Sequence, residues 1–120
     1  MMTTFEYRQA FLASMTEAEF QQQVIDYAHL QGWRVAWFRP VRVQRADGTV
    51  YYETPVGADG TGWPDLILVR EGRGIAWELK SQHGSPSSAQ IEWLNEFDAV
   101  GFETGIMRPS HWDQIEEALQ

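Results

Sequence analysis

Three charged residues in the second half of the sequence have types and spacing that suit phosphodiester chemistry. Asp65 follows Pro64 at the start of one apolar run, and Glu78 and Lys80 end a second apolar run as Glu-Leu-Lys. Carboxylate oxygens bind divalent cations, which activate a water molecule and neutralise charge that develops on a phosphate. A neighbouring ammonium group can orient or deprotonate that water, or stabilise the transition state. The three residues therefore predict a metal-dependent site for phosphodiester hydrolysis.

The two apolar runs have the length and composition of paired strands. We expect an antiparallel hairpin whose loop has two or four residues, which places Arg70 opposite Ile75. In that register Lys80 lies opposite Asp65, and Glu78 lies two positions further along. Because side chains alternate between the faces of a strand, all three charged side chains project to one side. An alternating Glu-x-Lys is commonly a solvated face, but these runs are apolar enough for central strands, where unpaired charges are unfavourable.

The remaining patterns predict one α/β domain around a mixed sheet, with residues 14–120 forming a single nuclease-type domain and residues 1–13 an arm or an added helix. The 120 residues, 43% of them hydrophobic, suffice for one core. The expected elements, in chain order, are a helix over 16–31, strands over 33–38, 41–45, 50–54, 65–69 and 75–80, a helix over 87–99, a strand over 103–107 and a helix over 110–119.

Composition limits which metal ion the site could bind and where in the cell we expect the protein. The chain has no cysteine, and its acidic residues outnumber its basic ones, so a bound metal ion is expected to be Mg²⁺ or Mn²⁺. No apolar run approaches the roughly 18 residues of a membrane span, and we expect a cytoplasmic protein without a membrane partner. The net charge of −8 argues against nonspecific nucleic-acid binding. Cations bound to carboxylates, or a symmetric assembly that gathers basic residues on one face, would offset that charge.

A cluster of arginines marks the expected DNA-backbone surface. Four of the nine basic residues lie around the first strands, at positions 34, 39, 42 and 45. The Asp47-Gly48 dipeptide favours a type I′ turn, which would place Arg42 opposite Glu53 in an ion pair. Arg39 and Arg45 would then be the freer contacts, and His83, close after Lys80, could also touch a phosphate.

Three segments together resemble a known nuclease superfamily. They are Gly62-Trp63-Pro64-Asp65-Leu66-Ile67, Trp77-Glu78-Leu79-Lys80 and Ser87-Ser88-Ala89-Gln90. The pattern looks like the PD-(D/E)xK nucleases and, more narrowly, is similar to the VRR-NUC (virus-type replication-repair nuclease) domain over about residues 16–119. The resemblance implies a restriction-endonuclease-like core and Mg²⁺- or Mn²⁺-dependent hydrolysis of DNA. It also implies a homodimer that acts on branched DNA such as four-way junctions, from a phage or a bacterium.

The resemblance also implies a glutamate contributed by the helix that precedes the sheet. Two residues could supply it. Glu17 shares the helical face of Phe20, which turns toward the sheet, whereas Glu19 points away and suits a capping box with Thr16. We therefore assign the role to Glu17, as a metal ligand directly or through water. Gln21, one turn further along, could also face the site.

Two further site residues follow from the same resemblance. The main-chain carbonyl of Leu79 is a metal ligand in nucleases of this type, and Gln90 matches their site glutamine. Ser87-x-x-Gln90 is also a capping-box pattern, so Gln90 could instead bond back to the Ser87 amide. Its helical face, shared with Leu94, favours the site.

Two other classes of function are compatible with the sequence. The chain could be a noncatalytic nucleic-acid- or protein-binding module that keeps a nuclease scaffold, or a structural subunit of a larger complex. A site that has lost its catalytic activity does not need Asp65, Glu78 and Lys80 together, so their joint presence favours the nuclease.

Overall fold

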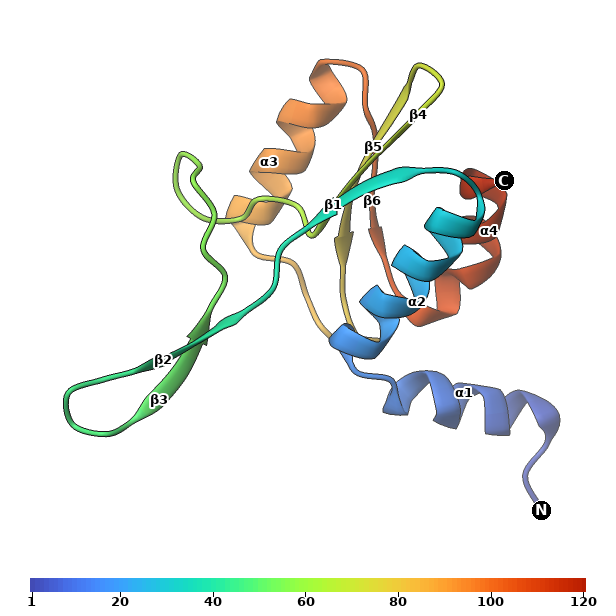
Figure 1. Cartoon of the computed structure of the whole chain (residues 1–120). Coiled ribbons are helices and arrows are strands. Elements are labelled where there is room, and N and C mark those ends of the chain that lie inside the picture. The colour runs from blue at the N-terminus through green and yellow to red at the C-terminus, as the bar shows by residue number, and fades with distance from the viewer.

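A computed structural model describes residues 1–120 and contains four α-helices, six strands and one short 3₁₀ helix. Figure 1 shows that the β2–β3 hairpin and α1 project from opposite sides of the domain. The elements are α1 (Thr4–Ser14), α2 (Glu17–Leu30), β1 (Arg34–Trp37), β2 (Val41–Gln44), β3 (Val50–Glu53), β4 (Leu66–Arg70), β5 (Arg73–Leu79), α3 (Ser88–Ala99), β6 (Glu103–Met107), η1 (Pro109–His111) and α4 (Trp112–Leu119). The segment before residue 14, for which we allowed an arm or a helix, is a helix.

Four strands form one mixed sheet in the order β1-β4-β5-β6, in which only the β5–β6 pair is parallel. Helices α2 and α4 pack on one face of this sheet, and α3 packs on the other (Figure 1). The main core lies on the α2 face, where Phe20 meets Leu66, Leu68 and Ile75. The predicted α/β class and the mixed sheet are confirmed. No helix in the structure is both long enough and apolar enough to cross a membrane.

Helices α2 and α3 begin where the sequence predicted, each at a capping box. Thr16 accepts a hydrogen bond from the Glu19 amide, 3.1 Å, and the Glu19 side chain accepts one from the Thr16 amide, 3.4 Å. Ser87 and Gln90 form the same arrangement at the start of α3. Two orphan amides are thus satisfied at each helix start. The expected capping role of Glu19 is confirmed.

The β4–β5 register differs from the predicted one by two residues. Arg70 pairs with Arg73 rather than with Ile75, because the turn consists of Glu71 and Gly72 alone. Both turn residues have positive φ, 50° and 81°, as a type I′ turn requires. A shift of two residues keeps every side chain on its predicted face. The expected pairing of Lys80 with Asp65 is therefore wrong, whereas their placement on one face does not change.

The β2–β3 hairpin closes with a longer turn than expected. Only Gly48 has positive φ, and the Asp47 carboxylate accepts hydrogen bonds from the Thr49 amide and hydroxyl, 2.9 and 2.7 Å. The type I′ turn predicted here is wrong, and the register changes by one residue. Arg42 consequently pairs with Tyr52 and not with Glu53. The predicted ion pair is absent, since the one ion pair in the chain joins Arg73 and Glu103.

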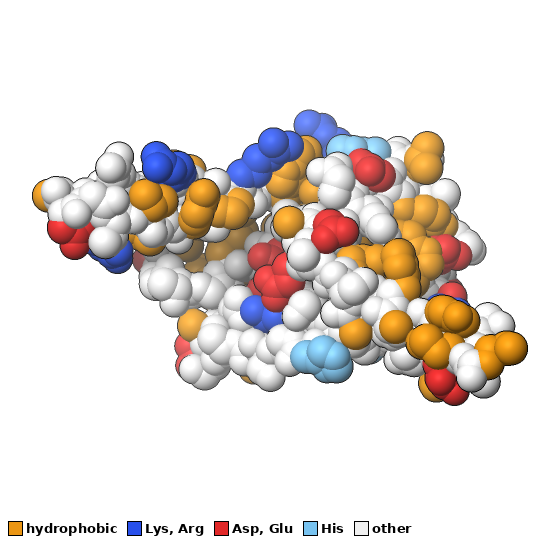
Figure 2. Space-filling model, turned by 90° about the horizontal axis from the view of Figure 1, so that it is seen from below, with side chains coloured by type: hydrophobic (Ala, Val, Ile, Leu, Met, Phe, Trp, Pro, Cys, Tyr) orange, Lys and Arg blue, Asp and Glu red, His pale blue; other side chains and the backbone are white.

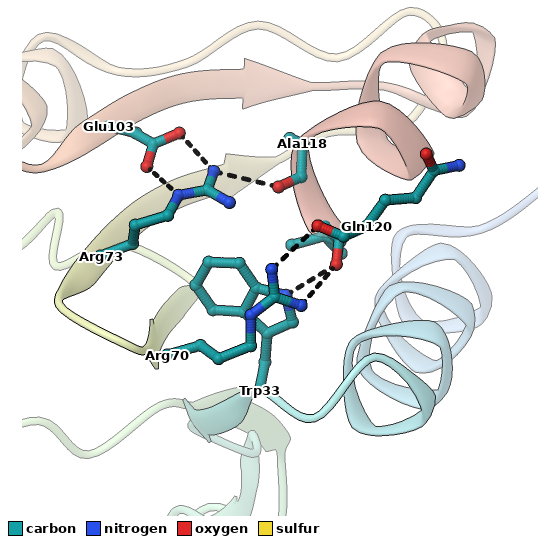
Figure 3. A network of polar contacts seen from close by, with 7 residues as sticks. Trp33, Arg70, Arg73, Glu103, Ala118 and Gln120 are labelled. Carbon is teal, nitrogen blue, oxygen red and sulfur yellow. Dashed lines mark hydrogen bonds and ion pairs between the residues drawn. The ribbon is translucent and has the colours of Figure 1, made fainter.

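A network of arginines fixes the end of α4 to the sheet (Figure 3). Arg70 donates hydrogen bonds to the main-chain oxygens of Gln31, Leu119 and Gln120, at 2.7, 3.0 and 2.8 Å. Its guanidinium lies 4.5 Å from the centroid of the Trp33 ring, whose Nε1 also donates to Leu119. Unpaired carbonyls at a helix end need donors, and a cation there also meets the negative end of the helix dipole.

We expect Arg70→Met to lower the free energy of unfolding by about 2 to 3 kcal/mol, since it removes a charged donor from three carbonyls. Arg34→Met is the matched control, because Arg34 is exposed and makes no side-chain hydrogen bond. Urea unfolding of both variants measures the difference. Equal stabilities would show that the network does not hold α4.

Candidate active site

Asp65 and Glu78 meet at the end of the sheet where β4 begins and β5 ends. Asp65 immediately precedes Leu66, the first residue of β4, which pairs with Trp77 of β5. Its Oδ2 accepts a hydrogen bond from the Leu79 amide, 2.8 Å, so the side chain is held against β5. Glu78 and Asp65 share the face of the sheet opposite the main core. The structure thus brings together the two carboxylates that the sequence predicted to converge.

Glu78 is the only buried charged residue, with a relative exposure of 1%. Its Oε1 accepts a hydrogen bond from Nε2 of Gln90, 3.1 Å. Its Oε2 is buried and has no hydrogen-bond partner. Buried polar atoms are almost always paired, so an orphaned carboxylate oxygen beside a second carboxylate indicates a missing cation or proton.

The environment of Glu78 favours its protonated form when no cation is bound. Burial raises the pKa of Glu78 to about 9, together with the adjacent Asp65 carboxylate, which can accept a hydrogen bond from the protonated Glu78 and repels the charged form. The charge of Lys80 lowers this pKa, and the charge of Glu17 raises it. All four groups are therefore close enough to interact electrostatically. A cation at the carboxylates would act on the Glu78 pKa in the same direction as Lys80.

Gln90 closes the capping box of α3 and also contacts Glu78, while its role in catalysis stays a prediction. Its Oε1 accepts a hydrogen bond from the Ser87 amide, 2.8 Å, and closes the capping box of α3. Its Nε2 donates to Glu78, as described above. One amide side chain has an acceptor and a donor at opposite corners, so capping fixes the orientation in which the nitrogen points at the carboxylate.

Glu17, the first residue of α2, reaches the segment that follows β5. Its Oε1 accepts a hydrogen bond from the Ser81 amide, 3.3 Å. Glu19 is engaged in the capping box at the same helix start. Helical phase therefore selected the glutamate that approaches the site. Gln21 lines the same groove as Glu17 and Asp65.

Lys80 follows β5, and side-chain alternation gives it the face of Glu78. Its main-chain amide donates to the Met107 carbonyl, 3.0 Å, which ties this position to β6. Its side chain forms no ion pair, although its charge acts on Glu78. The ammonium is therefore free to bind an incoming group. In Figure 2 acidic side chains gather beside a basic one in a hollow near the centre of the face.

Two grooves meet at Asp65. One, of about 330 Å³, is bounded by the start of α2 and the base of the β2–β3 hairpin. The other, of about 260 Å³, lies between the segment 54–62 and Gln90. Trp63 lines both, and its ring packs edge-on against Trp93, with 5.0 Å between centroids. An extended chain could therefore pass over Asp65 from one groove to the other.

The residues expected to contact DNA line neither of the two grooves at Asp65. Arg39 is exposed in the turn between β1 and β2, and His83 is exposed in the segment after β5. The Arg45 guanidinium lies 4.1 Å from the centroid of the Tyr51 ring. Arg45 is thus less free than predicted, while Arg42, assigned to an ion pair, has no such partner.

Sequence reasoning missed the residue that anchors the segment carrying Ser81. Arg108 donates hydrogen bonds to the carbonyls of Ser81, at 2.9 Å, and Gly84. Gln82 and Ser110 exchange two further hydrogen bonds between the same segments. These contacts join positions 24 to 28 residues apart, for which the sequence has no local signal.

The donor set at the site suits a hard divalent cation. No three side chains among His, Asp and Glu are arranged as a ready-made metal-binding group. Asp65 and Glu78 provide two carboxylates, and the orphaned Oε2 provides an unused ligand atom. Mg²⁺ typically binds one or two carboxylates and keeps several waters, so two are sufficient. Glu17 and the Leu79 carbonyl are the further candidates nearby, and the ligand roles of all four remain predictions.

Comparisons with family models, with curated proteins and with solved structures give no match to this chain. What the site can do therefore has to follow from its own geometry.

Removing the charge of Glu78 should change how stability depends on pH. Without divalent metal, the unfolded chain releases the Glu78 proton near the ordinary pKa of 4.5, while the folded chain keeps it to about 9. The folded state then binds more protons, so stability falls as pH rises between these values, by up to about 1.4 kcal/mol per unit. Glu78→Gln mimics the protonated side chain and should flatten that fall.

Urea unfolding in EDTA at pH 5, 7 and 9 measures the effect, with the exposed Glu96→Gln as the control. Parallel pH profiles for wild type and Glu78→Gln would contradict it.

Gly62 should tolerate no side chain, because it packs against the start of α3. Its φ is +94°, and an added Cβ would lie 2.5 Å from the Ala89 carbonyl carbon. Gly60 has a similar φ of +78° but open space around it. We expect Gly60→Ala to cost about 1 to 2 kcal/mol from backbone strain alone, and Gly62→Ala distinctly more. Thermal unfolding compares the pair; equal losses would exclude the close contact.

Proposed function

We propose that this chain is a Mg²⁺- or Mn²⁺-dependent nuclease that hydrolyses DNA phosphodiester bonds. The observation that carries the proposal is the buried Glu78 carboxyl, whose orphaned Oε2 lies beside Asp65 with Lys80 within electrostatic reach. Burying a carboxylate without a partner is unfavourable, and a bound cation would offset that cost. We also propose that the chain is a PD-(D/E)xK nuclease of the VRR-NUC type. The homodimer and the preference for branched DNA are part of the same proposal.

A divalent cation, when bound, would neutralise phosphate charge and lower the pKa of a bound water. Asp65 and Glu78 would hold it, with the Leu79 carbonyl and Glu17 as additional ligands, directly or through water. The hydrogen bond from Leu79 orients Asp65, and the one from Gln90 orients Glu78. Each carboxylate keeps its second oxygen free for the cation. Holding ligands in place before binding reduces the reorganisation that catalysis requires.

Lys80 would act on the reacting phosphate from the same side. Its ammonium can donate hydrogen bonds to a phosphate oxygen or orient the attacking water. Because Glu78 and Lys80 are two residues apart at the end of β5, alternation would place the cation and the ammonium on the same side of the sheet. Figure 2 shows that the hollow at the centre of this face is open, as a polymeric substrate requires.

We expect wild type to cleave end-labelled DNA with Mg²⁺ or Mn²⁺ and not with EDTA. Lys80→Ala and Asp65→Asn should each lower the rate by about 100-fold or more, because they remove a group that acts on the reacting phosphate. Four-way junction, flap, duplex and single-stranded substrates rank the preferred DNA structure. Asp98→Asn, on the exposed side of α3, is the control.

Thermal unfolding separates catalysis from the binding-module alternative. Mn²⁺ should raise the melting temperature of wild type, and this increase should disappear in Asp65→Ala. A folded protein that shows neither cleavage nor stabilisation by Mn²⁺ would overturn the proposal. Sedimentation tests the homodimer, and a monomer would count against junction resolution.

A further inference from the structure

The β2–β3 hairpin has one face that is solvent-exposed along its whole length. Pairing and alternation place Arg42, Gln44, Val50 and Tyr52 on this face, and all four are exposed. Tyr52 has a relative exposure of 66%, and its neighbour across the strands is Arg42. The opposite face carries the partly buried Tyr51, against which Arg45 stacks.

The exposed face continues the groove that contains Asp65. Pro40 and Thr54 each lie one residue outside the last hairpin pair, so alternation gives them the Arg42–Tyr52 face. Both residues line the groove of about 330 Å³ together with Asp65 and Glu17. The hairpin projects away from the sheet on that side (Figure 1), and Figure 2 shows it reaching outward from the central hollow. A chain lying in the groove would therefore extend onto this face.

The chemistry of the face suits an unpaired nucleic-acid strand. Directly paired side chains have Cβ atoms about 4.5 to 5.5 Å apart, so an arginine and an aromatic ring stand side by side. An exposed ring stacks on an unstacked base, and a neighbouring guanidinium binds the adjoining phosphate. The bases of an intact duplex are already stacked on one another, so they offer no face to the ring. Arg42 supplies the positive charge of this face, because Arg45 stacks on Tyr51 on the opposite face of the hairpin.

We propose that the Arg42–Tyr52 face of the hairpin binds a single-stranded DNA segment that adjoins the scissile phosphate. The proposal rests on the nuclease function proposed above and names the substrate class, DNA with unpaired bases beside the cleavage point. Tyr52 stacks on a base, Arg42 neutralises one phosphate, and the groove directs the strand across Asp65. Intact duplex lacks the unpaired bases and gains nothing from Tyr52.

Fluorescence anisotropy tests the binding with labelled single-stranded DNA and with the duplex of the same sequence. Ca²⁺ replaces Mg²⁺, and each sample is checked for product. We expect Tyr52→Ala to weaken single-strand binding about tenfold or more and to leave duplex binding unchanged. Arg42→Gln should weaken it and reduce the slope of log K against log salt by about 0.7, the value for one phosphate on a single strand.

Tyr7→Ala and Arg8→Gln are matched controls, since both residues are exposed on α1 and lie away from the grooves at Asp65. Circular dichroism and melting temperature establish that each variant is folded. Affinities of the hairpin variants equal to those of the controls would overturn the proposal, as would equal losses for single strand and duplex. A wild type that binds neither DNA would overturn it as well.

Cleavage kinetics with Mn²⁺ distinguish this proposal from the nuclease itself. A higher KM with unchanged kcat in Tyr52→Ala, on a substrate with an unpaired flank, supports both. If Tyr52→Ala cleaves the substrate with an unchanged KM, the nuclease proposal stands and the role of the hairpin is overturned. No cleavage by wild type, with binding that still depends on Tyr52, overturns the nuclease and supports the hairpin as a DNA-binding surface.

Discussion

The burial of the Glu78 carboxyl is the constraint around which the rest of the site is arranged. An acidic side chain on a central strand, with almost no exposed surface, needs either a proton or a cation. The neighbours account for only part of this need, because Gln90 satisfies one oxygen and leaves the other without a partner. Asp65 makes the unbound state less favourable still, since like charges at short distance resist joint ionisation.

Several elements that are far apart in the sequence serve to hold this carboxyl in place. The type I′ turn of Glu71 and Gly72 sets the β4–β5 register, so that Asp65 meets the end of β5. Gly62 allows the chain to pass close to the start of α3, from which Gln90 reaches Glu78. Each of these local features would be unremarkable alone. Together they bring groups from one strand pair and one helix to a single point.

The distribution of arginines explains how a chain with a net charge of −8 could meet a polyanion. Arg70 and Arg73 bind main-chain carbonyls and Glu103 (Figure 3), and Arg108 binds the carbonyls of Ser81 and Gly84, so all three stabilise the fold. The arginines of the hairpin region form no ion pair, and the hairpin region adjoins the groove. Local concentration of charge beside the site matters more for a bound strand than the sum over the chain. The radius of gyration, 16.0 Å against about 13.6 Å expected for this length, reflects the projecting hairpin and α1.

The sequence by itself determined the elements of the sheet and helices α2 and α3 with their caps, but neither α1 nor the 3₁₀ helix, and it determined the shared face of the charged residues. Helical periodicity and the two capping boxes located α2 and α3, and alternation placed Asp65 and Glu78 on one side of the sheet. The tertiary structure had to supply the registers, because each register follows from the length of its turn, and both hairpin turns differ from those predicted from the sequence. It alone decided which arginines are free, since the carbonyls that Arg70 and Arg108 bind become neighbours only when distant segments pack. Side-chain alternation and helical periodicity determine which residues share a face. Hydrogen-bond partners that are distant in the sequence depend on tertiary packing, which no short segment encodes.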